Sequence, residues 1–525
     1  MDNPPWNQPL TPLAFLDRSA GVFARRTAVA DGELRLSYAE LDDRTRRLAG
    51  GMHAAGVAAG DRVAVLAPNT HVLLEAHYGV PRAGGVLVAL NHRLNPHELA
   101  DIVKHAQARV LIADSMYSES ASVIAEANPE LGVLLADGPD GEYEAMLAAA
   151  PRLNHPVADE SELISLNYTS GTTGSPKGVM YHHRGAYLQS LAMAFHSKLD
   201  AGSGFLWTLP MFHCNGWCFT WAVTAAGGTH ICLRNVEPGE IWRMIRTGEV
   251  THFNAAPTVL TMLARHESAT EGPAPRTISV ATGGAPPSPT LLEEMAALNM
   301  DVTHLYGLTE TFGPVTLCEW MPEWNALPVD EQARIKARQG VGNVISERMR
   351  VVDRRGEDVA ADGETIGEVA LRGNNLMKGY FRDPDGTRKA MPNGWFRTGD
   401  LGVMHPDGYV ELRDRVKDII ISGGENIASI EVEQAIVSHP AVSEAAVVAA
   451  PDDNWGEIPI AFVDLRSGAH ATQDDIVGHV RDRLAHFKAP KLVIMGELPK
   501  TSTGKVQKYV LRKRAAAIVE EETSE

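Results

Sequence analysis

At 525 residues the chain is too long for a single hydrophobic core, and we expect a few domains. Its formal net charge of −18 argues against nucleic acid or an anionic membrane as the main partner. Four cysteines do not make a disulfide framework in a chain of this length, and no run of about 18 apolar residues predicts a membrane anchor. Residues 1–6 lack a signal-peptide pattern and residues 521–525 carry no peroxisomal signal, so we expect a cytoplasmic protein.

The first 160 residues alternate between helical and strand patterns. Leucines and alanines at helical spacing predict helices over Tyr38–His53 and His71–Arg82. Short apolar runs predict strands at Asp61–Ala67, Gly85–Leu90, Ala108–Asp114 and Gly132–Ala136. Strands separated by helices in this way are typical of βαβ units, so we expect a largely parallel sheet.

The segment Tyr168–Gly178 has the composition of a loop that wraps around a polyphosphate. Its three glycines let backbone N–H groups approach an anion, and its hydroxyl side chains and Lys177 add donors and a positive charge. It is not a Walker A loop, because its lysine is followed by glycine and not by serine or threonine. For this segment taken alone, a Gly/Ser/Thr surface linker is the alternative.

The α/β alternation continues to about residue 282. Further strands are predicted at Phe205–Pro210, Thr229–Leu233, His252–Ala256 and Thr277–Thr282. The last of them runs into a glycine-rich turn, Gly283 to Pro286, and such an exit from a strand is a candidate ligand site in an open α/β sheet. A plain tight turn is the alternative.

After Gly340 the pattern changes to short strands between Gly/Asp-rich turns, which predicts a small antiparallel β unit. Its strands are expected at Arg348–Asp353, Gly367–Arg372 and Gly408–Leu412. Beyond Asp414 a compact α/β pattern of about 110 residues is domain-sized. Its elements are strands at Asp418–Ser422, Ala445–Ala450 and Pro459–Asp464, and helices near Ile430–His439 and from Thr472, which pairs with Asp475 as a capping box.

Further motifs suit nucleotide chemistry. Tyr306-Gly-Leu-Thr-Glu-Thr311 offers an aromatic face for a base, a hydroxyl for a phosphate and a carboxylate for Mg²⁺. Trp395-Phe-Arg-Thr-Gly-Asp400 ends in a carboxylate that can accept both hydroxyls of a ribose. Residues 415–418 and 422–426 couple a positive segment to a second glycine turn, and Thr501-Ser-Thr-Gly-Lys505 places a lysine on a loop near the C-terminus.

From Pro12 to Arg514 the chain resembles the adenylate-forming superfamily, which unites acyl-CoA synthetases, peptide-synthetase adenylation domains and firefly luciferase. Residues 210–217 and 304–314 resemble the short- and medium-chain fatty acyl-CoA ligases, and among them the 3-methylmercaptopropionate-CoA ligases. The resemblance implies an α/β fold: a large N-terminal domain of stacked sheets (1–414) with a β-barrel-like unit (about 340–414), and a small mobile C-terminal α+β domain (415–525).

The resemblance also implies a reaction in two steps at one site. A small carboxylic acid reacts with ATP to give acyl-AMP and pyrophosphate, with Mg²⁺ as the metal, and CoA then takes the acyl group. A homodimer is compatible with this family.

The residue roles below are those that the resemblance implies. Lys505 would supply positive charge at the α-phosphate, Thr309 would hold the phosphate, and Glu310, with Thr172, would hold Mg²⁺. Lys417 would be the hinge between the domains, and Gly423 and Gly424 would face the CoA channel. The remaining nucleotide-binding positions are Thr169, Ser170, Gly171, Thr173, Gly174, Lys177, Gly284, Ala285, His304, Tyr306, Asp400 and Arg415. His304 stands where many relatives carry Asn or Gln for the adenine amino group, and a neutral imidazole can still accept that hydrogen bond.

The acyl pocket is expected to be lined by His213, Trp217, Gly283, Phe312, Gly313 and Pro314. Plain core packing is the alternative for Trp217. Cys214 and Cys218 lie four residues apart beside His213, but the sequence offers no fourth ligand for a metal. Two alternatives to an acyl-CoA ligase also stay open: a non-catalytic adenylate-binding relative, and a ligase that loads a free-standing carrier protein.

Overall fold

The computed structural model describes residues 7–169, 176–284, 287–415, 417–422, 425–452, 455–500 and 506–524. By their internal contacts they divide into two compact units. Unit 1 holds the described residues up to 337 together with 341–348 and 372–396, and unit 2 holds 338–340, 349–371 and the described residues from 397 onward. Much of the expected β unit thus groups with the C-terminal residues; the domain boundary at 414/415 stays a prediction.

Unit 1 contains two sheets, six-stranded and nine-stranded over the described residues. The six-stranded sheet runs β6 (Gly132–Ala136), β5 (Ala108–Asp114), β3 (Arg62–Leu66), β4 (Val86–Ala89), β7 (Leu163–Thr169), β8 (Lys177–His182), and only the β7–β8 pair is antiparallel. The other sheet runs β15 (Val341–Gly342), β14 (Gly313–Leu317), β13 (Met300–Leu308), β12 (Ile278–Thr282), β11 (His252–Ala255), β9 (Gly204–Leu206), β10 (Thr229–Ile231), β1 (Thr27–Asp31), β2 (Leu34–Ser37).

Helices connect and cover these strands, as the alternating pattern predicts. The helices of unit 1 are α1 (Leu13–Val22), α2 (Tyr38–Ala54), α3 (His71–Arg82), α4 (Pro96–Ala106), α5 (Ser118–Ala127), α6 (Glu142–Ala149), α7 (His183–His196), α8 (Cys214–Trp217), α9 (Phe219–Ala226), α10 (Pro238–Arg246), α11 (Pro257–Arg265), α12 (Pro289–Ala297), α13 (Val329–Lys336) and α14 (Pro384–Ala390). Helix α2 begins at a capping box in which the Ser37 N–H donates to Glu40 Oε2 at 2.7 Å.

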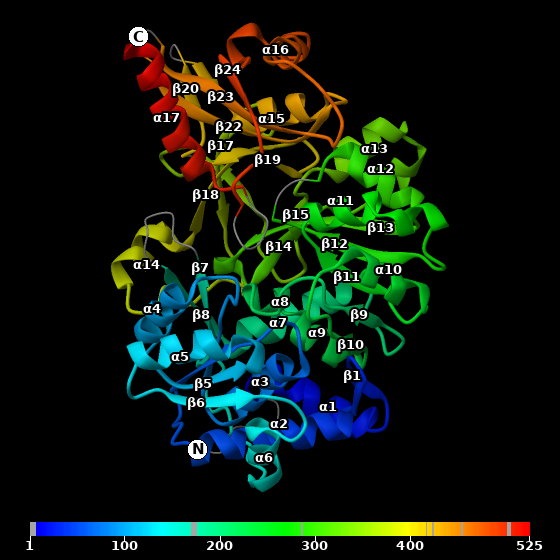
Figure 1. Ribbon diagram of the computed structural model, residues 1–525, viewed down its shortest axis with the longest axis vertical. Coiled ribbons are helices and arrows are strands. Elements are labelled where there is room, and N and C mark those ends of the chain that lie inside the picture. The colour runs from blue at the N-terminus through cyan, green and yellow to red at the C-terminus, as the bar shows by residue number, and fades with distance from the viewer. Residues whose placement is uncertain are drawn as a thin grey trace. The chain divides into compact units, whose positions relative to one another are not determined.

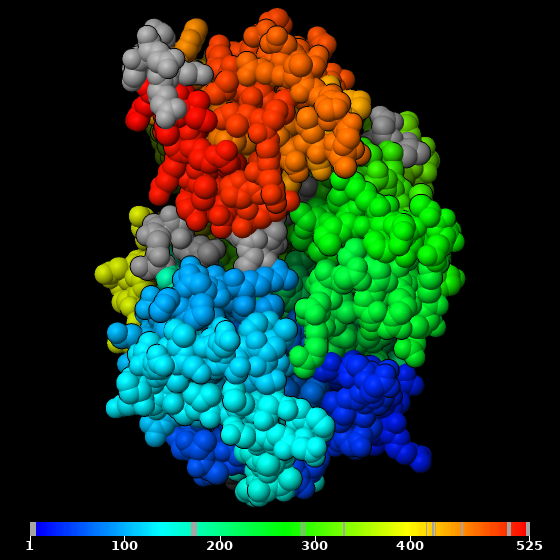
Figure 2. Space-filling model, viewed as in Figure 1, coloured from blue at the N-terminus to red at the C-terminus, as the bar shows by residue number. Residues whose placement is uncertain are grey.

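Each sheet has its own hydrophobic core. Helices α4 and α5 bury Leu99, Ile102 and Ile124 against the six-stranded sheet, and α10, α11 and α12 bury apolar side chains against strands β9 to β13. Figure 1 shows α10 to α13 in green beside the strands of the nine-stranded sheet. The surface in Figure 2 is accordingly cyan over α5 and α6 and green over the α10–α13 region. Helix α3 is buried along nearly its whole length.

Unit 2 contains two smaller sheets in its described part. One is β16 (Arg350–Val352), β17 (Gly367–Leu371), β18 (Phe396–Met404), β19 (Val410–Arg415), and the other is β21 (Glu425–Ile427), β20 (Ile420–Ser422), β23 (Gly456–Leu465), β22 (Val442–Asp452), with β24 (Leu492–Met495) paired to β23. Helices α15 (Ser429–Val437) and α16 (Gln473–Arg481) pack in one core with the second sheet, and α17 (Lys508–Ser524) packs in another.

The predicted fold class is confirmed: the chain is α/β, with a large N-terminal part of several sheets and a smaller C-terminal part. The parallel pairings of β3 to β7, the antiparallel pairs β16–β17 and β18–β19, and the Thr472–Asp475 capping box are as expected. Strands β8 and β14 were not expected, because both begin in glycine-containing segments that read as turns.

Candidate functional site

The segment expected to wrap a polyphosphate joins two paired strands. Thr169, at the end of β7, is the register partner of Lys177, at the start of β8. The loop between them is therefore closed at its base by an antiparallel pair, which fixes where both of its ends lie. Its predicted phosphate contacts Ser170, Gly171, Thr172, Thr173 and Gly174 lie outside the described residues.

A third segment, residues 377–381, runs beside β8 and brings in Tyr380. The Met180 N–H donates to Gly379 O at 3.0 Å, and the Phe381 N–H donates to Gly178 O at 2.7 Å. The Lys177 Nζ lies 4.6 Å from the centre of the Tyr380 ring, a cation–π distance. The Tyr380 hydroxyl donates to Glu310 Oε1 at 2.8 Å.

Tyr380 thus links the base of the loop to the predicted metal ligand. Burial and the adjacent Glu310 carboxylate raise the pKa of Tyr380, so its hydroxyl stays a proton donor at neutral pH. The Met377 N–H also donates to Glu310 O at 2.8 Å. Lys177 and Glu310, 133 positions apart in the sequence, meet around one aromatic ring.

Thr309 and Glu310 lie in the 3₁₀ turn Thr309–Thr311 between β13 and β14. The Tyr181 hydroxyl donates to Thr309 O at 2.6 Å, and the Cys214 thiol donates to Thr309 Oγ1 at 3.6 Å. Phe312, which follows the turn with φ +60°, stacks on the Tyr181 ring at a centroid distance of 3.8 Å. The turn is therefore held from β8 and from α8.

Predicted adenine contacts lie just after the carboxyl end of β12 and in the neighbouring part of β13. Thr282, just before Gly283 and Gly284, is the register partner of His304. The buried His304 ring makes an Nδ1 contact with Ala337 O at 3.0 Å. A carbonyl oxygen only accepts, so Nδ1 carries the hydrogen, and in a neutral ring Nε2 is then the nitrogen that can accept. Tyr306 lies further along β13 and is also buried.

The predicted acyl-pocket residues Trp217, Gly283 and Gly313 are brought together. A Cβ at Gly283 would lie 3.1 Å from Trp217 Cη2, and a Cβ at Gly313 would lie 3.0 Å from Trp217 Cα. Gly313 also has φ +95°. The buried Trp217 therefore fits between two positions that only glycine leaves free. His213 directly precedes α8, and Pro314 O accepts a hydrogen bond from Gln189 Nε2 at 2.5 Å.

In unit 2, Asp400 and Arg415 are register partners in β18 and β19, and Arg415 Nε lies 2.9 Å from Asp400 Oδ1. Lys417 follows in the turn after β19, where burial and the nearby Arg415 lower its pKa. Ala285, Gly423, Gly424 and Lys505 lie outside the described residues.

Known proteins match this chain over nearly its whole length. The AMP-binding enzyme family model matches residues 16–381, and the model of the AMP-binding enzyme C-terminal domain matches residues 431–505. The chain belongs to the AMP-binding enzyme family. The resemblance inferred from the sequence motifs is thereby confirmed.

Several relatives of this AMP-binding enzyme cover it almost end to end. Acetate/butyrate–CoA ligase AAE7 of Arabidopsis thaliana is 44% identical over 96% of this chain and 94% of its own length. The 4-hydroxybutyrate–CoA ligase 2 of Metallosphaera sedula is 40% identical over 99% and 97%. Among solved structures, ATP-bound MatB from Rhodopseudomonas palustris has a TM-score of 0.85 at 28% identity, with 97% of this chain and 99% of that chain covered.

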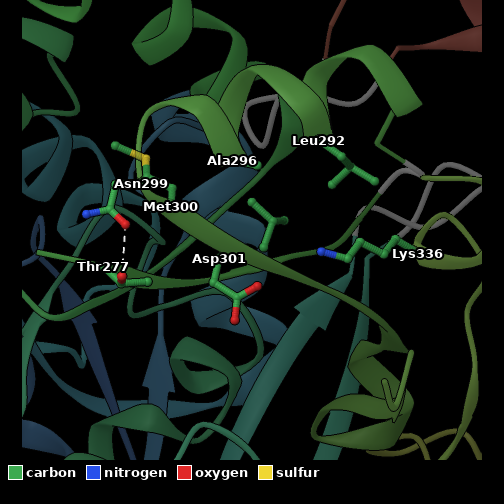
Figure 3. Close-up of a pocket in the computed structure, with 8 residues that line it drawn as sticks. Thr277, Leu292, Ala296, Asn299, Met300, Asp301 and Lys336 are labelled. Carbon is green, nitrogen blue, oxygen red and sulfur yellow. Dashed lines mark hydrogen bonds between the residues drawn. The ribbon is translucent and has the colours of Figure 1, made fainter. Parts of the chain in front are cut away.

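Figure 3 shows a pocket of about 160 Å³ in this AMP-binding enzyme, and none of the residues that line it is a predicted site residue. Its lining includes Thr277, Met300 and Asp301, at the amino ends of β12 and β13, and Leu292 and Ala296 of α12. Ligands in open α/β sheets bind at the carboxyl ends of the strands, and Gly283 follows the carboxyl end of β12 with His304 beside it. The pocket in Figure 3 is therefore not part of the candidate site.

Sequence reasoning missed Tyr380 and Tyr181, which tie Glu310 and Thr309 to β8. Neither tyrosine lies in the motifs from which the site was predicted. Both act through contacts made only in the folded chain, so the sequence offers no local signal for them.

Proposed function

We propose that this AMP-forming acyl-CoA ligase activates a small carboxylic acid of short to medium chain length, 3-methylthiopropionate included. The single observation that carries the proposed site is the meeting of Lys177 and Glu310 around Tyr380, at the base of the expected phosphate loop. A lysine, a threonine turn and a carboxylate at one point provide groups for a polyphosphate and its metal. The acetate, butyrate and 4-hydroxybutyrate in the names of two relatives support the size of the acid.

In the first step one carboxylate oxygen of the acid attacks the α-phosphorus of ATP, forming the acyl-AMP bond, and the bond to pyrophosphate breaks. The acid is already ionised near pH 7, because its pKa is about 4, so no general base is required. What the reaction needs is positive charge near the transferring phosphoryl group. We assign this charge to Lys505, with Lys177 orienting the phosphates that leave.

The other predicted residues position ATP. Thr309 holds a phosphate, and Thr169 with residues 170–174 encloses the β- and γ-phosphates. Gly284, Ala285 and Tyr306 flank the adenine, His304 Nε2 accepts from its amino group, and Asp400 and Arg415 bind the ribose. The acyl chain lies against His213, Trp217, Gly283, Phe312, Gly313 and Pro314.

Glu310 fits a magnesium ion. Its half-buried carboxylate is oriented by the Tyr380 hydroxyl, and carboxylate oxygen is the ligand type that Mg²⁺ prefers. Among the described residues no group of three His, Cys, Asp or Glu side chains is placed to hold a metal. A single carboxylate, together with Thr172 and the substrate phosphates, suits Mg²⁺, because Mg²⁺ keeps several water ligands and needs few from the protein. Bound there, Mg²⁺ would neutralise charge on the phosphates.

In the second step the CoA thiol loses its proton to solvent and its sulfur attacks the acyl carbon. The bond from that carbon to the phosphate-linked oxygen breaks, and AMP leaves with this oxygen, which came from the acid. Lys417 is the proposed hinge, and Gly423 and Gly424 are the proposed contacts of the pantetheine. A carrier protein's phosphopantetheine is the alternative acceptor, since it presents the same thiol.

The experiment is a pyrophosphate-release assay on the purified enzyme with ATP, Mg²⁺ and a series of acids from acetate to dodecanoate, 3-methylthiopropionate and benzoate, with and without CoA. We expect acid-dependent release that peaks among the shorter acids and AMP-forming turnover with CoA. Pyrophosphate release that no acid increases would refute the proposed ligase activity. Turnover that requires a carrier protein would show that the carrier protein, and not CoA, accepts the acyl group.

We also propose a cytoplasmic location and a homodimer. No helix among the described residues is long and apolar enough to cross a membrane. Light scattering of the purified enzyme tests the dimer, with about 57 kDa expected for a monomer of the 56.7 kDa chain and twice that for a dimer.

A further inference from the structure

A network of buried polar side chains surrounds Asn215, which the predicted roles leave unused. Asn215 Oδ1 accepts from Ser165 Oγ at 2.5 Å and from Asn167 Nδ2 at 2.6 Å, and its own N–H donates to Asn167 Oδ1 at 3.1 Å. Its Nδ2 lies 3.0 Å from His77 Nε2. All four side chains are at most 2% exposed. The network therefore joins α3, β7 and the α8 turn deep inside unit 1.

The hydrogen bonds fix the state of His77. An amide nitrogen only donates, so His77 Nε2 must accept from Asn215, and its Nδ1–H then donates to Leu73 O at 2.7 Å. Burial lowers the pKa of His77 to about 4, which keeps the ring neutral. A buried amide that lacks hydrogen-bond partners destabilises the folded protein. Each side chain of the network is therefore held where it can bond to the next.

The backbone at Asn215 is strained. Cys214, Asn215, Gly216, Trp217 and Cys218 all have φ between +46° and +64°, a left-handed turn with four non-glycine residues. Each such residue costs about 1–2 kcal/mol, somewhat less for asparagine, so the turn exists only because surrounding contacts enforce it. Asn215 is bonded through its side chain, its N–H and its carbonyl, which accepts from Thr220 Oγ1 at 3.3 Å.

The turn carries groups of the proposed site at both ends. Cys214 Sγ donates to Thr309 Oγ1, and Cys218 Sγ donates to Phe312 O at 3.5 Å. Trp217 lies between Gly283 and Gly313, where added Cβ atoms would come within 3.1 Å and 3.0 Å of it. A change in the turn would move Trp217 out of this fitted position.

We infer that Asn215 and His77 are positioning residues that set the acid specificity by holding Trp217 as a wall of the acyl pocket. The inference rests on the proposed function, in which Trp217 contacts the acyl chain. Weakening the network frees the indole, enlarges the space for the acid and shifts preference toward longer acids. One methylene in an apolar pocket is worth about tenfold or more in kcat/KM, so the shift is measurable.

Three substitutions weaken the network and one preserves it. Asn215→Gly deletes the side-chain bonds but accepts the left-handed backbone without strain. In His77→Leu the new side chain is similar in size to histidine but offers no acceptor for Asn215 Nδ2, whereas in His77→Gln the new side chain keeps an acceptor. Ser165→Ala, which removes one of two donors to Asn215 Oδ1, is the milder variant for use if Asn215→Gly does not fold. The matched control is Tyr143→Phe, which deletes a buried hydroxyl that donates to Glu75 Oε2 at 2.6 Å. Glu75 lies two residues before His77 in α3, so the two side chains leave the helix on different faces.

The readout is the ratio of kcat/KM for hexanoate to that for acetate, which does not depend on the folded fraction of enzyme. We expect Asn215→Gly and His77→Leu to raise this ratio by about tenfold or more, and Ser165→Ala to raise it less. His77→Gln and Tyr143→Phe should leave it unchanged. An unchanged ratio in Asn215→Gly and His77→Leu, or an equal rise in Tyr143→Phe, overturns the inference. Absence of acid-dependent pyrophosphate release in the unmodified enzyme refutes the proposed function instead.

Discussion

Replacing Tyr380 with phenylalanine tests whether Glu310 is held for a metal. The substitution removes the hydroxyl that donates to Glu310 Oε1 at 2.8 Å and leaves the ring under Lys177 Nζ. A hydrogen bond to a charged group contributes about 1.5–3 kcal/mol, so the loss is substantial. Loss of a partner that orients a metal ligand typically weakens metal binding by about tenfold to a hundredfold.

The assay is pyrophosphate release as a function of Mg²⁺ concentration, with acid and ATP saturating. We expect Tyr380→Phe to raise the Mg²⁺ concentration for half-maximal rate by about tenfold or more, with most of the rate regained at high Mg²⁺. Tyr143→Phe is the matched control, because it also removes a tyrosine hydroxyl from a carboxylate, that of Glu75, at 2.6 Å. An Mg²⁺ dependence identical in both variants and the unmodified enzyme would refute the role of Glu310.

Three other predictions concern single steps, packing and pH. Lys505→Ala should abolish acyl-AMP formation and spare thioester formation from supplied acyl-AMP; equal loss of both half-reactions would contradict the assignment. Gly313→Ala should lower the free energy of unfolding in urea by about 2 kcal/mol or more, because φ is +95° and the new Cβ would lie 3.0 Å from Trp217 Cα. An unchanged urea midpoint would contradict this packing argument. Burial lowers the pKa of His77 and His183 to about 4 and of His230 to about 3, below the unfolded value of about 6.5. The unfolded chain therefore binds more protons, and stability should fall as pH drops below about 6.5, by up to about 1.4 kcal/mol per pH unit for each histidine; urea midpoints that stay constant from pH 7 to pH 5 would contradict this.

Strands β3 to β6 of the six-stranded sheet were predictable because each is a short apolar run with its own boundaries, as in Ala108–Asp114 and Gly132–Ala136, which match β5 and β6 residue for residue. Strands β1 and β13 of the other sheet were not predicted. The motif around Thr309 and Glu310 was predictable for a similar reason: its residues are adjacent in the chain. Strand β14 was not, since it begins with Gly313-Pro314 and reads as a turn.

Contacts between distant segments were beyond sequence reasoning. Tyr380 meets Glu310 across 70 positions, and Asn215 meets His77 across 138. A polar residue such as Asn215 reads as part of a loop, yet it is fully buried and bonded on every side. Only the folded topology brings these partners together, and with them the geometry that holds Trp217.

Isotope transfer tests the central claim most directly. The enzyme is incubated with ATP, Mg²⁺, CoA and a carboxylic acid labelled with ¹⁸O in both carboxylate oxygens, and the products are analysed by mass spectrometry. Because a carboxylate oxygen attacks the α-phosphorus and stays with it, we predict one ¹⁸O in AMP and none in pyrophosphate. Label in inorganic phosphate with formation of ADP, or AMP without label, would contradict the account.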